Sequence, residues 1–75
     1  MPHHPGEITY VDGATQKVVA VEDASSVPES LRFAETPSGP VPVVKVVMQR
    51  NGRYSEILEY GPDGQLLRTT IGSGR

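Results

Sequence analysis

Short runs rich in valine, isoleucine and leucine recur along the chain and are separated by turn residues. The first two runs are "EITYVDG" and "KVVAVED", and Asp12-Gly13 lies between them. β-Branched and aromatic residues on either side of an Asp-Gly pair are typical of two paired strands. The pattern therefore predicts an N-terminal β-hairpin that turns around Asp12-Gly13.

The next segment, "ASSVPESLRFAET", has two readings. Ser26 and Glu29 have the spacing of a helix capping box, and Pro28 is tolerated in a first helical turn. Against a helix, Leu31 and Phe33 alternate as they would in a strand. We expect a short helix over 27–34, with a strand as the alternative, followed by a loop over 37–42 ("PSGPVP").

The C-terminal half predicts a three-stranded meander over 43–71. Residues 43–50 ("VVKVVMQR") are apolar at positions of both parities, which is typical of a strand at the centre of its sheet. Asn51-Gly52 predicts a two-residue hairpin turn into strand 53–60. Pro62-Asp63-Gly64 predicts a three-residue loop, with Gly64 in the left-handed conformation, leading into "LLRTTIG".

These elements predict an all-β, or β-dominated α+β, fold: an N-terminal hairpin, a long crossover with a short helix, and an antiparallel meander. An open sheet and a small closed barrel both fit this order of elements. Residues 1–6 ("MPHHPG") are expected to form a flexible tail, and residues 7–75 a single small domain.

The predicted turns fix which side chains share a face of the meander. A turn at Asn51-Gly52 places Arg50 opposite Arg53, and the following loop places Leu58 near Arg68. The face expected to be the core contains Val44, Val46, Met48, Ile57, Leu67 and Ile71. The second face, with Glu56 among its charges, is the predicted interaction face and contains Val43, Val47, Tyr54, Leu58, Tyr60, Leu66, Lys45 and Arg68.

Composition limits how much of this sheet the chain can cover. The 75 residues include one Phe, no Trp and no Cys, so the core is aliphatic and no disulfide or thiolate metal site stabilises it. Small domains of this kind often rely on association with a partner or a second copy. No apolar run reaches the roughly 18 residues of a membrane span, and the first residues lack a signal-peptide pattern. We therefore expect a cytoplasmic protein.

Residues suited to catalysis are scarce. The two histidines, His3 and His4, lie in the predicted tail, and Glu56 and Glu59 have opposite strand parity and so do not form a pair. No pattern indicates a cofactor, a metal centre or a small-molecule substrate. We expect a non-catalytic protein–protein interaction or regulatory module that binds a partner protein, or itself as a homodimer, through the second face.

Two other functions are compatible with the sequence. Arg50, Arg53 and Arg68, together with Tyr54 and Tyr60, could bind single-stranded nucleic acid, although three acidic residues are interspersed in the same half of the chain. Removal of Met1 would leave Pro2-His3-His4, whose terminal amine, amides and third-position histidine suit square-planar Cu(II) or Ni(II).

Overall fold

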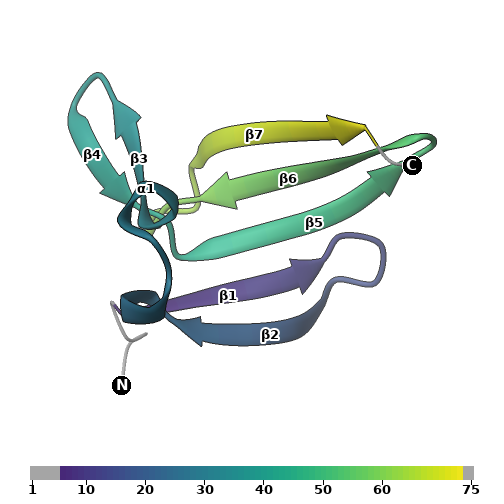
Figure 1. The fold of residues 1–75 in the computed structure, drawn as a ribbon, viewed down its shortest axis with the longest axis horizontal. Helices are drawn as coiled ribbons and strands as arrows, with labels where there is room; N and C mark the ends of the chain where they lie inside the picture. Colours follow the sequence, from purple (N-terminus) through teal and green to yellow (C-terminus); the bar gives the residue numbers. More distant parts are fainter. Residues whose placement is uncertain (1–5, 74–75) are drawn as a thin grey trace.

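The protein forms an open five-stranded sheet with a small two-stranded sheet at one end (Figure 1). The structure, a computed structural model, describes residues 6–73. The strand order in the larger sheet is β2-β1-β5-β6-β7, so β2 and β7 are its two edges. The elements are β1 (Glu7–Asp12), β2 (Lys17–Asp23), η1 (Ala24–Ser26), α1 (Glu29–Arg32), β3 (Phe33–Thr36), β4 (Gly39–Pro42), β5 (Lys45–Asn51), β6 (Tyr54–Tyr60) and β7 (Leu66–Ser73). The predicted β-dominated fold is confirmed, as an open sheet and not a barrel.

β5 is the central strand, as its two apolar faces predict. It pairs in antiparallel orientation with β6 and in parallel orientation with β1. Parallel strands require a long crossover, and the segment between β2 and β5 supplies it. The sequence predicted the crossover but not that it would join the hairpin and the meander into one mixed sheet.

The N-terminal hairpin turns where Asp12-Gly13 predicts. The Asp12 carboxylate accepts a hydrogen bond from the Ala14 backbone N–H at 2.8 Å. Gln16 completes the turn in the left-handed region, with φ of 62°. The β1–β2 register then shifts by one residue between Tyr10 and Val11, which places a bulge in β2.

The crossover contains both a short helix and a strand, the two structures that its sequence allowed. Helix α1 spans only Glu29–Arg32, and β3 begins at Phe33. The predicted capping box does not form, because Pro28 is the residue before the helix and makes no side-chain hydrogen bond to it. The predicted loop over 37–42 is in part strand, since Gly39–Pro42 pairs with β3 in a separate hairpin.

The β5–β6 turn lies one residue beyond its predicted position, which shifts the pairing of the two strands by two residues. Asn51 pairs with Tyr54, so Gly52 and Arg53 are the central turn residues and Arg50 faces Ser55 instead of Arg53. Gly52 has φ of +64° at the first central position, where a type II′ turn requires glycine. Because a shift of two keeps the parity, β5 and β6 still present the predicted faces.

The β6–β7 pairing contains a one-residue error in the predicted register. The loop has the expected form: Gly64 has φ of +80°, and Tyr60 pairs with Leu66. A bulge then pairs Glu59 with Arg68, and Leu58 with Thr69 instead of Arg68. A shift of one exchanges the faces, so the rest of β7 is inverted relative to the prediction.

The hydrophobic core lies at one end of the larger sheet, under η1, α1 and the β3–β4 hairpin (Figure 1). We call this side of the sheet the covered face. Of the predicted core residues, Val46 is buried and Leu67 packs against the core, but Met48 and Ile57 are 37% and 38% exposed, because the cover does not extend to them. The core cluster contains Ile8, Val27, Ala34, Val43 and Val46.

Candidate interaction surface on the open face of the sheet

The other side of the sheet, which we call the open face, has no described element packed over it. Its middle row runs across all five strands in register, because β1 pairs with both β2 and β5 and the meander continues to β7. Four of the five side chains in this row are aliphatic. The row consists of Val18, Val11, Val47, Leu58 and Thr69.

The neighbouring row is amphipathic. The Lys45 ammonium lies 5.6 Å from the centre of the Tyr60 ring, a cation–π arrangement that positions the charge above the sheet. On the other side of the middle row, the Gln49 side-chain amide donates to Glu56 at 2.8 Å. Apolar centre and polar flanks together resemble the composition of a protein interface.

Burial on the open face falls from the centre to the edges. Val11 is 6% exposed and Val47 9% exposed, and both lie on inner strands of the sheet. Val18, Leu66 and Ile71 on the edge strands are 60%, 53% and 61% exposed. The edge strands therefore hold most of the apolar surface that a partner could bury here.

Two adjoining hollows lie on this face, and Pro62 of the β6–β7 loop lines both. One follows β1 past Thr9 and Val11, and the other lies over Val47 and Leu58. Lys45 lines both hollows, so each has a cation at its border.

Most of the predicted interaction residues lie together here. By strand parity and pairing, six of the eight share the open face: Val47, Tyr54, Leu58, Tyr60, Leu66 and Lys45. The other two lie on the covered side. Val43 precedes the regular part of β5 and is 3% exposed in the core, and the β7 bulge turns Arg68 to the covered face.

The N-terminal hairpin adds apolar surface that the sequence pattern did not predict. Val11, Val18 and Val21 extend the apolar surface, and Ile71 joins it through the bulge. The valine run of β2 was visible in the sequence, but its place depends on the parallel β1–β5 pairing, which no local pattern indicates.

Arg68 forms an ion pair on the covered face with Glu59, which is 7% exposed. Its Nε donates to Glu59 Oε1, and this hydrogen bond raises the pKa of the Arg68 guanidinium. Nearby, burial raises the pKa of Tyr10, with a further contribution from Glu22, to which its hydroxyl donates at 3.3 Å. The Glu59–Arg68 ion pair neutralises the Glu59 carboxylate, which would be costly to bury alone.

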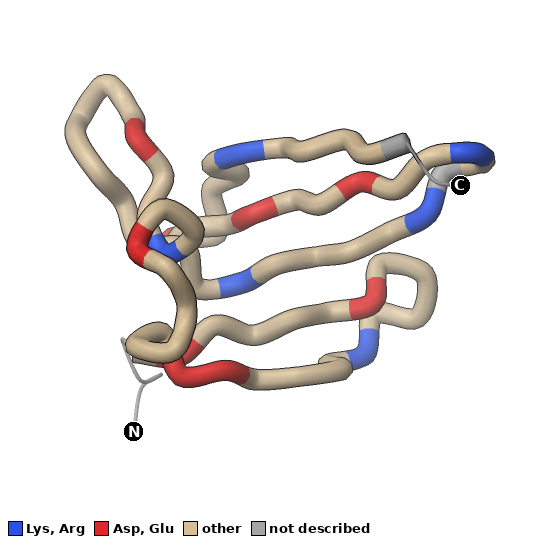
Figure 2. Tube along the Cα trace, in the orientation of Figure 1, with Lys and Arg blue, Asp and Glu red and all other residues tan. Residues whose placement is uncertain are grey.

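The residues of the nucleic-acid alternative do not gather on one surface. Arg50 lies on the covered side of β5, Arg53 is in the turn, and Arg68 is paired with Glu59, whereas Tyr54 and Tyr60 lie on the open face. Figure 2 shows basic positions at the tip of the β5–β6 hairpin and acidic positions at the far end of β2. The alternative stays a prediction without a favouring observation.

The metal-binding alternative lies outside the described residues, because it involves Pro2, His3 and His4. Within residues 6–73, no group of three or more His, Cys, Asp or Glu side chains is placed to hold a metal ion. In the same range, no helix is long and apolar enough to cross a membrane.

No protein-family model, curated protein or solved structure matches this chain.

Proposed function

We propose that the protein is a small, non-catalytic interaction module that binds a protein partner, or a second copy of itself, through the open face. The observation that supports this most is the row of five side chains, four of them aliphatic, that crosses all five strands without a covering helix or strand among the described residues. The cytoplasmic location predicted from the sequence stays a prediction.

The energetics of the open face favour a bound partner. Burying an exposed aliphatic side chain contributes about 1.5–3 kcal/mol, so a few such residues on β2 and β7 can offset the entropy cost of association. Lys45 and Glu56 give the surface charges of both signs. In a two-fold dimer, Lys45 of each copy could meet Glu56 of the other, which would fix the register of the two sheets.

Size exclusion with light scattering tests the homodimer form. We expect wild type to shift towards a dimer as protein concentration rises, and Val18→Glu or Leu66→Glu to remain monomeric. Leu31→Glu is the matched control, because Leu31 is 50% exposed on α1, away from the open face. A wild-type monomer at every concentration, with a cooperative melt, would rule out the dimer.

Covalent footprinting tests whether any other partner is present. The protein is labelled in native extract and, separately, after purification. We expect reduced labelling of Val18 and Leu66 in the extract, and unchanged labelling of Leu31. Equal labelling in both samples would contradict the proposal.

A further inference from the structure

The two edge strands of the sheet are protected to different extents. β2 carries Lys17 at its start, Glu22 and Asp23 at its end, and a bulge between them. Charges and bulges are common devices that prevent an edge from pairing with another strand. β7 has a single charged residue, Arg68 near its start, and no charge or proline from Thr69 to Ser73 (Figure 2).

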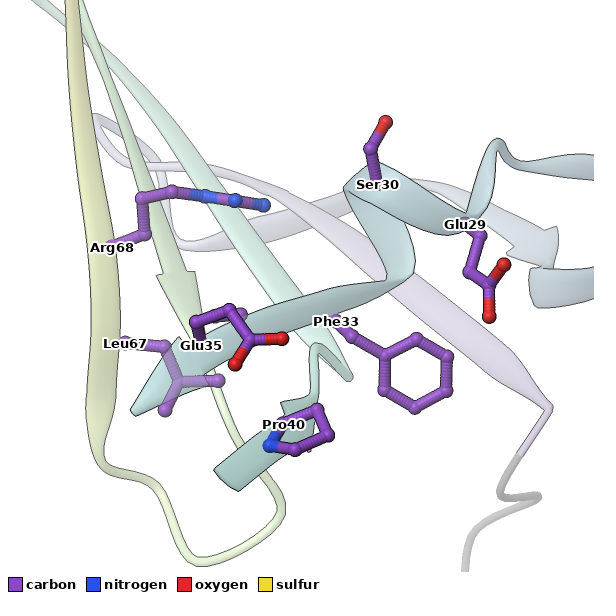
Figure 3. Close-up of a pocket in the computed structure, with 8 residues that line it drawn as sticks. Glu29, Ser30, Phe33, Glu35, Pro40, Leu67 and Arg68 are labelled. Carbon is purple, nitrogen blue, oxygen red and sulfur yellow. The ribbon is translucent and has the colours of Figure 1, made fainter. Parts of the chain in front are cut away.

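A hollow adjoins the start of this unprotected edge (Figure 3). It has a volume of about 740 Å³ and lies between α1, the β3–β4 hairpin and β7. Phe33, Pro40 and Leu67 supply its apolar lining, and Phe33 is 37% exposed. This apolar lining can receive an apolar side chain from a neighbouring segment, and the volume leaves room for the backbone that carries it.

The charges around the hollow are mainly unpaired carboxylates. Glu29 and Glu35 line it, are exposed, and have no ion pair among residues 6–73. Arg68 also lines it but is paired with Glu59. Arg32 also lies nearby, against the Phe33 ring. The local net charge is therefore −1, from the three carboxylates of Glu29, Glu35 and Glu59 and the two guanidinium groups of Arg32 and Arg68. A basic side chain at the rim would be complementary.

We propose that the edge of β7 accepts an extended peptide as an added antiparallel strand. Because β7 starts beside the hollow, an antiparallel peptide has its C-terminal end there. An apolar side chain near that end enters the hollow, and the Lys or Arg that follows lies between Glu29 and Glu35. Backbone pairing supplies affinity and the hollow supplies specificity, as in other strand-addition sites. This site is separate from the open face and does not depend on the function proposed for it.

Titration of ¹⁵N-labelled protein tests the proposal. The probe is an acetylated, amidated peptide of alternating Thr and Val, as long as β7, that ends in Leu-Lys. We expect saturable shifts in the backbone amides from Thr69 to Ile71 and in Phe33, and none in β2. Replacing the peptide Lys by Glu, or its Leu by Ala, should weaken binding about tenfold. N-methylation of alternate peptide amides should abolish it, because the edge pairing is lost.

Variants of the protein separate the hollow from the edge. Phe33→Ala and Glu35→Gln should each weaken binding of the Leu-Lys peptide, whereas Glu22→Gln and Val18→Glu should leave it unchanged. No binding, shifts that map to β2 or the open face, or equal affinity for the Lys and Glu peptides would each overturn the proposal. A peptide copying Leu66–Ser73 that binds at least as tightly would show that the occupant is a second copy, and the assigned occupant would be wrong.

Discussion

The two faces of the central strand bury neighbouring valines equally but in different ways. Val46 on the covered face is 7% exposed and belongs to the core cluster, under the crossover elements. Val47 on the open face is 9% exposed, yet it lies outside the core cluster, between β1 and β6 and beside a hollow that Pro62 of the β6–β7 loop also lines. Low exposure on a sheet therefore does not by itself mean a core. A chain of this length has covered one end of one face and left a second apolar surface without a covering helix or strand among the described residues.

The largest expected effect comes from truncating these two valines in turn. Val46→Ala should lower the free energy of unfolding by about 1.5–3 kcal/mol, because packed neighbours cannot fill the space that is left. Val47→Ala should cost about 1 kcal/mol, since water can occupy the vacated site on the open side. Urea denaturation of both variants measures the difference. Equal losses would mean that the open face is as well packed as the core.

The next effect concerns the Glu59–Arg68 ion pair on the covered face, in which Glu59 is buried and Arg68 is partly exposed. Glu59→Gln should cost about 1–2 kcal/mol, because Arg68 loses its charged acceptor and a polar group is left poorly satisfied. Glu59→Leu combined with Arg68→Leu should recover most of that loss, since neither charge remains to be compensated. A double variant less stable than Glu59→Gln alone would show that the pair stabilises the fold beyond its own compensation.

The β5–β6 turn sets the register of both faces of the sheet, so a turn variant should lower the stability of the whole sheet. Gly52→Val should cost about 1 kcal/mol, because a β-branched residue resists a φ of +64°. An added Cβ would meet no atom within 4 Å at this position, so the cost would come from the backbone alone. Gly72→Ala is the control, because the added Cβ would make an ordinary van der Waals contact with Ser55 Oγ at 3.6 Å. An unchanged melting temperature in Gly52→Val would argue against this turn.

Local signals predicted the strands well and the relations between strands less well. Asp12-Gly13, Gly52 and Gly64 each mark a turn that forms, and the two-sided apolarity of 43–50 placed β5 at the centre. These features depend on backbone conformations that a few residues determine.

What the sequence did not predict arises from single-residue shifts and long-range pairing. The bulge opposite Glu59 moved Arg68 to the covered face and Ile71 to the open face, and nothing in "LLRTTIG" marks which residue will be unpaired. The parallel β1–β5 pairing brought Val18 beside the meander through contacts distant in sequence. The sequence thus predicted which C-terminal side chains share the open face, apart from Val43 and Arg68, but did not predict that N-terminal side chains join them.

The smallest expected effect lies where the chain leaves the open sheet and starts to cover the other face. Asp23 ends β2, and its carboxylate accepts hydrogen bonds from the Ser25 N–H at 3.0 Å and the Ser25 hydroxyl at 2.9 Å. The backbone hydrogen bond is the main cause of a lowered Asp23 pKa, below 3.8. A carboxyl group whose pKa is lower in the folded state than in the unfolded state stabilises the fold at pH values above the unfolded-state pKa. This stabilisation is lost as the pH falls through the folded-state pKa. The Ser25 amide shift should therefore titrate with a midpoint below 3.8. Asp23→Asn keeps an acceptor oxygen but has no proton to gain, so this transition should disappear in the variant. A transition that persists in Asp23→Asn, or a wild-type midpoint at or above 3.8, would show that Asp23 does not hold the first turn of the segment that covers the core.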